Sequence, residues 1–246
     1  MSLAKKIREK RKILQKNNVI CIDINLREKE VQCLNDIKVE KGLDQFNHYG
    51  PVDSKLQNNL TKYFSEMGGN SKSDVDRISR LVTRISKNMI EGFEEESAWT
   101  MVRVALPNEL YDIPRWHPDG SYFKSSKKVY KLVMSLKGPQ TLFGEKINVK
   151  KYDQLSRKSG ENVEANIIKN NNPKKFKKED LRIRKEIIKV VKKTKVCKKG
   201  QAGIYLVGDK DAAIHSEPKM NAPRIFISIL VGSKAQIKEW ESKGKK

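Results

Sequence analysis

Three residues with metal-binding side chains are spaced along this sequence so that strands could bring them together. The stretch RWHPDGSYF (115–123) places His117 two positions before Asp119, in a chain with 3 histidines. On an extended strand, side chains two positions apart point to the same side. His215 follows much later, in AAIHSEP, after an apolar segment and the turn GDKD. If His215 lies on a neighbouring strand, two imidazoles and one carboxylate would hold one face of a divalent metal ion.

Arg224 lies nine residues after His215, where it begins the apolar segment RIFISILVG. Its planar guanidinium matches the geometry of a carboxylate. Two histidines and one carboxylate leave several positions of an ion open, an arrangement typical of non-haem Fe(II) oxygenases. A bidentate oxoacid and dioxygen could use those positions, while Arg224 holds the far end of the oxoacid.

Each of these residues also has a purely structural interpretation when taken alone. Asp119 could be a turn residue beside an isolated histidine, His215 a hydrogen-bonded core histidine, and Arg224 the partner in a salt bridge at a strand end. The four residues together are harder to explain by separate structural roles, so the pattern favours a metal site. His48, in FNHYGP, fits no such pattern and is expected in a loop.

The segments around these residues favour strands in the second half of the chain. β-Branched and apolar runs predict strands at 19–24, 98–106, 129–136, 203–208 and 224–232. A polar, lysine-rich insert at about 144–199 interrupts this half, and its segment 179–193 suits an amphipathic helix or a strand. Antiparallel sheets closing on each other would bring His117 and His215 together.

The first half favours helices. Apolar residues recur at helical spacing in 54–67 and again from Val75 to Met89. Ser73 and Asp76 have the spacing of a capping box, and Gly92 is a candidate end of the second helix. The opposite face of that helix, which could contact a polyanion or simply be solvated, carries Arg77, Arg80, Arg84 and Lys87.

The pattern His117-x-Asp119, a distant His215 and Arg224 resembles that of the Fe(II)/2-oxoglutarate-dependent dioxygenases. The passage KKGQAGIYLVGDKDAAIHSEP, followed by PRIFISI, is similar to the second half of their core. The resemblance covers about residues 98–232 without most of the insert. It implies a double-stranded β-helix, a jelly-roll of the cupin type, in a mainly β chain with N-terminal helices (α+β). It also implies Fe(II) and 2-oxoglutarate as cofactors and dioxygen as co-substrate.

By this resemblance, His117, Asp119 and His215 bind the iron, and Arg224 binds 2-oxoglutarate. The family often adds a hydroxyl group from a neighbouring strand as a second contact to the oxoacid. The candidates for this contact are Tyr130, Thr141 and Ser228, of which Ser228 has the strand parity of Arg224. The candidates for the substrate side are Arg115 and Tyr122.

Two departures restrict the subfamily. The nucleic-acid demethylating branch has a second arginine six positions after the first, where this chain has Leu230. The jumonji branch takes its oxoacid anchor from a lysine on an earlier strand, so Arg224 argues against that branch too. The pattern therefore predicts a hydroxylase without fixing its subfamily.

The chain divides into four predicted regions. These are a basic N-terminal arm (1–16), a helical support region (17–97), a catalytic core (98–232) containing the insert, and a basic C-terminal tail (233–246). We expect the loop between 106 and 123 and the insert to flank the mouth of the site and to select the substrate.

The net charge of +22 is concentrated in two segments. Residues 1–16 contribute +6 and residues 169–199 contribute +11. Such segments favour nucleic acid or an acidic protein surface, although a lysine-rich coding bias explains them equally well. We expect a protein or peptide substrate first, because a basic mouth suits an acidic peptide. RNA comes second, since Phe176 is the one aromatic residue in 169–199 for stacking on bases, and a small metabolite comes third.

Two rival classes remain open from the sequence. One is a jelly-roll that has lost catalysis and binds nucleic acid through its basic segments. The other is a cupin that holds a different metal without an oxoacid. The sequence does not indicate an oligomeric state.

The three cysteines, Cys21, Cys33 and Cys197, form an odd number without a CxxC pair. Neither a disulfide framework nor a cysteine zinc site is therefore expected, and a reducing, intracellular setting fits. The basic stretches KKIREKRK and KKFKK could direct the protein to the nucleus. No apolar run approaches the roughly 18 residues of a membrane span, and no secretory signal is indicated. We expect a cytoplasmic or nuclear protein that is not secreted.

Overall fold

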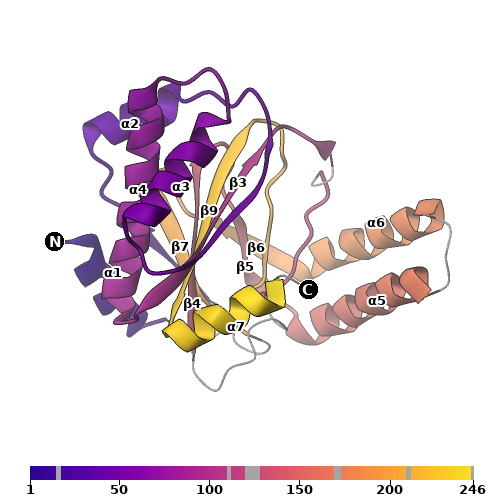
Figure 1. Cartoon of the computed structure of the whole chain (residues 1–246). Coiled ribbons are helices and arrows are strands. Elements are labelled where there is room, and N and C mark those ends of the chain that lie inside the picture. The colour runs from indigo at the N-terminus through magenta and orange to yellow at the C-terminus, as the bar shows by residue number, and fades with distance from the viewer. Residues whose placement is uncertain (15–17, 110–111, 120–127, 169–172, 209–211, 245–246) are drawn as a thin grey trace.

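The computed structural model describes the chain apart from residues 15–17, 110–111, 120–127, 169–172, 209–211 and 245–246, and apart from the side chains of 160–177 and 244. In chain order its elements are α1 (Leu3–Arg11), β1 (Val19–Asp23), α2 (Glu28–Asp36), β2 (Leu43–Gly50), α3 (Ser54–Ser65), α4 (Lys72–Phe93), β3 (Ser97–Ala105), β4 (Val129–Lys137), β5 (Leu142–Ile147), α5 (Val149–Ile168), α6 (Pro173–Val190), β6 (Val191–Val196), β7 (Gln201–Val207), β8 (His215–Ser216), β9 (Arg224–Gly232) and α7 (Lys234–Gly244). The N-terminal helices lie on one side of the sheets, and the α5–α6 hairpin projects from the other (Figure 1).

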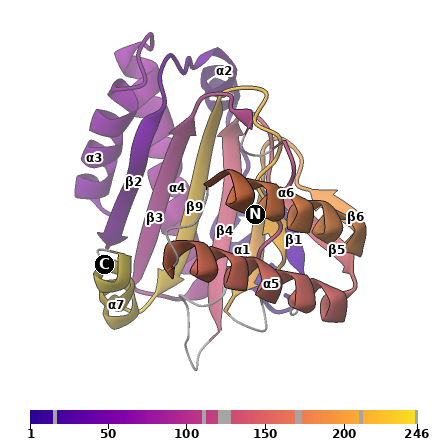
Figure 2. The ribbon, with the colours of Figure 1, turned by 90° about the vertical axis from the view of Figure 1, so that its right-hand side faces the viewer.

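Two antiparallel sheets form the centre of the protein. The larger has the order β1-β7-β4-β9-β3-β2, and the smaller has the order β6-β5-β8. Figure 2 shows β2, β3, β9 and β4 side by side, with α5 and α6 in front of the sheets. Helices combined with antiparallel sheets define an α+β protein, which confirms this part of the fold prediction.

The strongest sequence patterns correspond to observed elements. The five predicted strands are β1, β3, β4, β7 and β9, and the two predicted helices are α3 and α4. The elements without a clear pattern are α2, β2, β5, α5, β6, β8 and α7. His48, expected in a loop, lies in β2.

Side-chain alternation in β4 and β9 separates a helix-covered face from a second face that includes the predicted site residues. On β9 the helix-covered face carries Ile225, Ile227, Ile229 and Val231. On β4 it carries Tyr130, Leu132, Met134 and Leu136. Because neighbours in a strand point to opposite sides, Arg224 and Ser228 of β9 lie on the second face, as do Lys131 and Ser135 of β4.

Helix α4 differs from the prediction at both ends. Its N-cap is Ser71 rather than Ser73, and the Ser71 hydroxyl accepts a hydrogen bond from the N–H of Asp74. Gly92 lies inside the helix, where an added Cβ would come within 2.6 Å of Ile7. The glycine therefore permits the close approach of α1 to α4 and does not end the helix.

Both ends of the chain form packed helices. In α1 the buried residues are Leu3, Ala4 and Ile7, and in α7 they are Ile237 and Trp240. Each helix buries one apolar face and directs its Lys and Arg outward, which is why their composition resembles a basic arm and a basic tail. Neither described helix is a free appendage.

The lysine-rich insert contains two strands of the smaller sheet. β5 pairs antiparallel with β6, and α5 and α6 lie between them in sequence. Ile183 and Ile187 of α6 pack with Tyr152 of α5 and with Trp116, next to the predicted metal ligand His117. Within the predicted insert at about 144–199, the excursion from the sheets consists of α5 and α6. The segment 179–193 contains both predicted alternatives, since α6 gives way to β6 at Val191.

Cys21 and Cys197 form a disulfide, which corrects the expectation that the cysteines are unpaired. The two residues are 176 positions apart, with Cα atoms separated by 5.4 Å. They meet because β1 pairs with β7, with Cys21 opposite Gly203, and Cys197 precedes β7 by a short turn. Cys33 is a buried free thiol.

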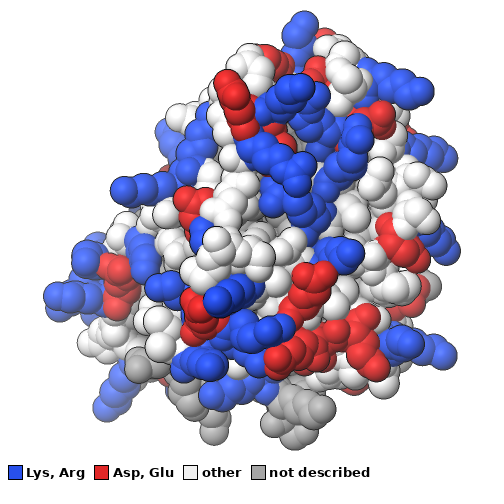
Figure 3. Space-filling view, turned by 90° about the vertical axis from the view of Figure 1, so that its left-hand side faces the viewer, with Lys and Arg blue, Asp and Glu red and all other residues white. Residues whose placement is uncertain are grey.

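Lys and Arg side chains are spread over the face formed by the N-terminal helices, interrupted by groups of Asp and Glu (Figure 3). Several basic residues of α4 are engaged within the protein. Arg77 donates to the carbonyl of Lys29, and Arg84 forms an ion pair with Glu30 at 2.8 Å. These contacts join α4 to α2. None of the described helices is long and apolar enough to cross a membrane.

Candidate metal centre

Backbone hydrogen bonds hold His117 and His215 side by side. The N–H of each residue donates to the carbonyl of the other at 2.9 Å, which forms an isolated antiparallel bridge. On its other side His215 pairs with Phe143 of β5. The carbonyl of Asp119 accepts a hydrogen bond of 2.8 Å from the N–H of Gly208, just after β7. The smaller sheet and the end of β7 thus fix the backbone of all three predicted ligands.

The Nδ1 atom of each imidazole has a backbone carbonyl as its partner. His117 Nδ1 lies 2.8 Å from the carbonyl oxygen of Arg115, and His215 Nδ1 lies 3.0 Å from that of Ala213. A carbonyl oxygen only accepts hydrogen bonds, so this network assigns the proton of each neutral ring to Nδ1. Each Nε2 then keeps its lone pair for a metal ion, and the contact also fixes the orientation of the ring.

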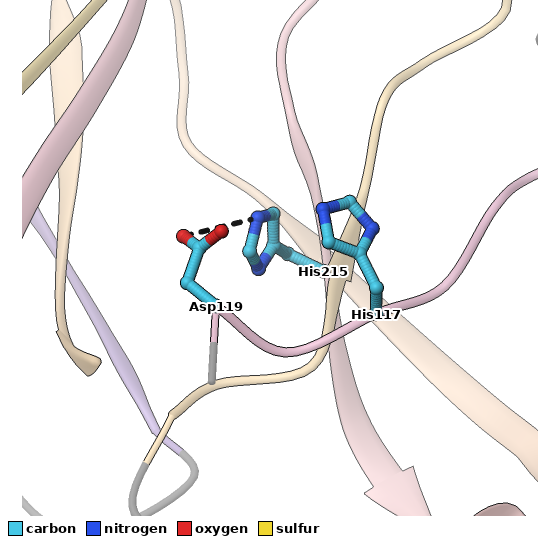
Figure 4. Close-up of side chains that lie close together, drawn as sticks. All are labelled: His117, Asp119 and His215. Atoms are coloured by element: carbon cyan, nitrogen blue, oxygen red, sulfur yellow. Dashed lines mark ion pairs between the residues drawn. The ribbon is translucent and has the colours of Figure 1, made fainter. Parts of the chain in front are cut away.

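Two donors converge on one oxygen of Asp119. Lys131 Nζ donates to Oδ2 at 2.8 Å, and the Tyr205 hydroxyl donates to the same oxygen at 2.9 Å. His215 Nε2 lies 3.5 Å from this oxygen, and the dashed line in Figure 4 marks this pair. These contacts orient the carboxylate beside the imidazoles.

The local electrostatics favour the protonation states that metal binding requires. Burial alone would raise the pKa of Asp119, but the Lys131 ammonium together with the charges of His215 and His117 outweighs it and holds that pKa well below its usual range. Burial lowers the pKa of His215 to about 4, although the Asp119 carboxylate opposes the shift. Burial and the same carboxylate raise the pKa of Tyr205 well above its ordinary value. At neutral pH the site contains a carboxylate, a neutral imidazole at 215 and a phenol that donates.

The donor set fits a ferrous ion. One ligand atom from each of His117, Asp119 and His215 lies within 4.8 Å of the others, so a modest side-chain adjustment would let one ion contact all three. Two imidazole nitrogens and one carboxylate are the ligands of a non-haem Fe(II) site with open positions. Figure 4 shows the three side chains pointing toward one another from two chain segments.

Arg224 is buried and held by three oxygen acceptors. Its Nε donates to the Ser135 hydroxyl and to the Pro139 carbonyl, each at 3.0 Å, and its Nη2 donates to the Thr141 hydroxyl at 2.9 Å. The guanidinium carbon lies 4.5 Å from the centre of the Phe226 ring. These oxygen acceptors and the aromatic face hold the cation in place.

One cavity of about 110 Å³ joins Arg224 to the three candidate metal ligands. Its wall consists of Met101, Arg103, Arg115, His117, Asp119, Lys131, Thr141, His215, Glu217, Arg224 and Phe226. Residues predicted to bind a metal and a carboxylate therefore face the same space, although they come from separate parts of the chain.

The other predicted site residues are placed differently. Thr141 lines the cavity and contacts Arg224, and Arg115 lines the cavity while pairing with Glu217 at 2.9 Å. Tyr130 lies on the helix-covered face, where its ring stacks on Phe93 at 4.4 Å, so the structure does not bring it to the cavity. Ser228 is fully buried and is not part of the cavity wall. Tyr122 lies outside the described residues.

Lys131, Tyr205 and Ser135 are site residues that the sequence interpretation missed. Lys131 had a detectable signal, because it is a single charge inside the apolar strand VYKLVMSL. A charge in such a strand needs a buried partner, which here is Asp119. Tyr205 and Ser135 had no comparable signal, since both residue types are common in half-buried strands.

No protein-family profile and no curated protein matches the chain. Among solved structures, AviO1 from Streptomyces viridochromogenes Tue57 is similar at 9% identity and a TM-score of 0.42, over 94% of this chain and 96% of that one. SnoN, a non-haem α-ketoglutarate-dependent epimerase from nogalamycin biosynthesis, is similar at 12% identity and a TM-score of 0.42, over 93% of this chain and 83% of that one. HygX from Streptomyces hygroscopicus, with nickel and 2-oxoglutarate bound, is similar at 10% identity and a TM-score of 0.38, over 92% of this chain and 87% of that one. Because these TM-scores are below 0.5, we infer the function from the geometry of the site.

Proposed function

We propose that this protein is an Fe(II)- and 2-oxoglutarate-dependent oxygenase. The observation that carries the proposal is the shared cavity, whose wall combines the lone-pair nitrogens of His117 and His215, the carboxylate of Asp119 and the buried cation of Arg224. A metal site without an oxoacid does not require a buried guanidinium on the same wall. The two facing antiparallel sheets are consistent with the double-stranded β-helix of these oxygenases, and this assignment is part of the proposal.

His117, Asp119 and His215 would hold the iron, and Arg224 would bind the distal carboxylate of 2-oxoglutarate. Together with dioxygen, these cofactors supply the oxidation of a substrate C–H bond. Tyr205 and Lys131 orient Asp119 through its Oδ2 atom, and the carbonyls before each histidine fix the ring tautomers. Thr141 and Ser135 hold the guanidinium at the end of the cavity through hydrogen bonds to their neutral hydroxyl groups.

An anaerobic titration tests the proposal directly. Fe(II) added with 2-oxoglutarate should give a weak visible charge-transfer band, and His117→Ala should abolish it. His48→Ala is the matched control, because His48 lies in β2 outside the cavity and contacts Pro51. The band should survive in this control.

The titration also separates the rival classes. A protein that binds the metal but gives no band with 2-oxoglutarate, and whose Arg224→Ala variant keeps all activity, is a cupin with other chemistry. RNA binding that weakens with salt and ignores the metal supports a non-catalytic module. Succinate release from 2-oxoglutarate in the presence of candidate substrates then identifies turnover.

A further inference from the structure

A second cavity adjoins the candidate metal centre beneath the α5–α6 hairpin. It has a volume of about 400 Å³ and is lined by Arg115, Trp116, His117, Ser156, Ser159, Asp180, Ile183, Arg184 and Ile187. Arg115 and His117 also line the first cavity, so the two spaces meet at a candidate metal ligand. A molecule in the second cavity would therefore lie beside the metal position.

The hairpin is fixed over this cavity by packing close to the metal ligands. Tyr152 of α5 donates a hydrogen bond from its hydroxyl to the carbonyl of Trp116 at 3.3 Å. Tyr152 also packs with Trp116, Ile183 and Ile187 in one buried cluster. Because Trp116 directly precedes His117, the roof of the cavity and the metal centre form one continuous structure.

The size of the cavity suits a small molecule. Sites for small ligands have volumes of roughly 300–1,000 Å³ and combine apolar walls with a few polar groups. Trp116, Ile183 and Ile187 supply apolar surface, and Ser156 and Ser159 supply hydroxyl groups. The buried indole N–H of Trp116 has no hydrogen-bond acceptor among the described residues, so an acceptor on a bound molecule would satisfy it.

The charges around both cavities favour an anionic ligand. The basic lining residues are Arg103, Arg115, Lys131, Arg184 and Arg224. The acidic ones are Asp119, Asp180 and Glu217. The resulting excess of two positive charges is unchanged when Fe(II) and doubly negative 2-oxoglutarate are added, because their charges cancel. A third component with two negative charges would neutralise the site, and one with a single negative charge would halve the excess.

We propose that the second cavity is the substrate site and that the substrate is a small molecule with a carboxylate or phosphate group and an apolar part. The role of the bound molecule as a substrate rests on the proposed oxygenase function. Anion binding in this cavity does not need the metal. Arg184 is the cation specific to this cavity, and it is held at 2.7 Å by Asp180 one helical turn earlier. A peptide substrate, which the sequence favours, is an alternative outcome of the test.

The test uses metal-free full-length protein with benzoate and phenyl phosphate as anionic probes and benzyl alcohol as the neutral probe. Binding is followed by ligand-observed saturation-transfer NMR and by titration. We expect the anions to bind and the alcohol to bind at least tenfold more weakly. Arg184→Gln should weaken anion binding at least fivefold, whereas Arg182→Gln, an exposed neighbour on α6 that does not line the cavity, should leave it unchanged. Ser159→Trp should block the cavity without removing a charge.

Several results would overturn the inference. These are equal binding of the neutral probe, no binding of any probe, and insensitivity to both Arg184→Gln and Ser159→Trp. Loss of binding in Arg224→Gln but not in Arg184→Gln would place the anion in the oxoacid pocket and would also overturn it. Displacement of benzoate by a glutamate-rich pentapeptide that binds through Arg184 would also overturn the inference of a small-molecule substrate. The separate Fe(II) titration distinguishes failure of the oxygenase proposal, because probe binding through Arg184 would persist without a charge-transfer band.

Discussion

His117 and His215 exchange both of their backbone hydrogen bonds at 2.9 Å, and their ring centroids are 4.5 Å apart. Residues far apart in sequence thus become direct neighbours through main-chain pairing, before any metal is considered. Two residues outward on the two segments, the side chains of Arg115 and Glu217 form an ion pair. The two histidines are therefore presented by an isolated antiparallel bridge, so their spacing depends on backbone geometry that side-chain substitutions outside the bridge should leave intact.

Lys131→Met should destabilise the metal-free protein and strengthen metal binding. The Lys131 and Asp119 side chains are mostly buried, and removing one partner of a buried ion pair costs about 3–5 kcal/mol. A metal ion at Asp119 would neutralise the remaining carboxylate and would no longer be repelled by the ammonium group. We expect metal affinity to rise roughly tenfold or more, because charges a few Å apart near a protein surface interact by about 4 kcal/mol.

Thermal unfolding with and without Fe(II) or a redox-inert divalent substitute measures both effects of Lys131→Met. Lys137→Met is the matched control, since Lys137 ends the same strand and its ammonium group contacts the Asn35 carbonyl in an exposed position. The control should change neither the unfolding temperature nor the metal affinity. Weaker metal binding in Lys131→Met would mean that orientation of Asp119 outweighs charge repulsion.

The residues predicted from the sequence to bind 2-oxoglutarate should separate into three grades of effect. Arg224→Gln removes a charge-assisted contact and should weaken 2-oxoglutarate binding roughly 10- to 100-fold with little change in metal affinity. Thr141→Val removes one neutral hydrogen bond to Arg224 and should weaken it by a factor of roughly five. Ser228→Ala and Tyr130→Phe should change it less than twofold, because neither residue lines the cavity. Calorimetric titration with a redox-inert metal bound measures all four; a large effect of Ser228→Ala would restore Ser228 as the second contact.

The sequence indicates residues that the structure brings to one cavity, because each of them is adjacent to a strongly patterned strand. His117 and Asp119 precede β4, His215 follows β7, and Arg224 begins β9. Antiparallel strands with apolar residues on both faces must be covered on both sides, so polar residues at their ends meet in a limited space. The type and approximate position of these strands could therefore be inferred without coordinates.

Other features depend on long-range pairing that leaves no local signal. β6 is an exposed edge strand rich in lysine, a composition that protects strand edges and also resembles a disordered insert. The Cys21–Cys197 disulfide requires the pairing of β1 with β7. Tyr130 could be placed only by knowing which face of β4 the helices cover. Tyr130 lies on that face, and its neighbour Lys131 points to the opposite face, toward Asp119.

Cys21→Ala should destabilise the oxidised protein by about 2–5 kcal/mol, because the disulfide closes a loop of most of the chain. Unfolding in denaturant, with and without a reducing agent, measures the loss. Reduction should lower the stability of the wild type to that of the variant and should have no further effect on Cys21→Ala. Thiol titration in denaturant should find one reactive thiol before reduction and three afterwards; three before reduction would show that the bond does not form.

The buried thiol of Cys33 should make stability decrease at alkaline pH. Its sulfur lies 3.5 Å from the Asp74 carbonyl, and burial, followed by the Asp74 carboxylate, raises the pKa of the thiol to about 11 from an ordinary 9.0. Below pH 9 the thiol is protonated in both the folded and the unfolded chain. Between pH 9 and 11 only the unfolded chain loses this proton, so the free energy of unfolding falls by at most about 1.4 kcal/mol for each pH unit.

Comparison with Cys33→Ala isolates this contribution, because the variant retains every other group that titrates in the same range. The difference in unfolding free energy between wild type and variant should be constant from pH 7 to 8.5 and should then shrink as the pH rises toward 10.5. Alkylation by iodoacetamide should remain slow in the folded wild type over the same range, since the thiolate is the reactive form. A difference that stays constant up to pH 10.5, together with rapid alkylation, would show that the thiol is not held in its protonated form by the packing of α2 against α4.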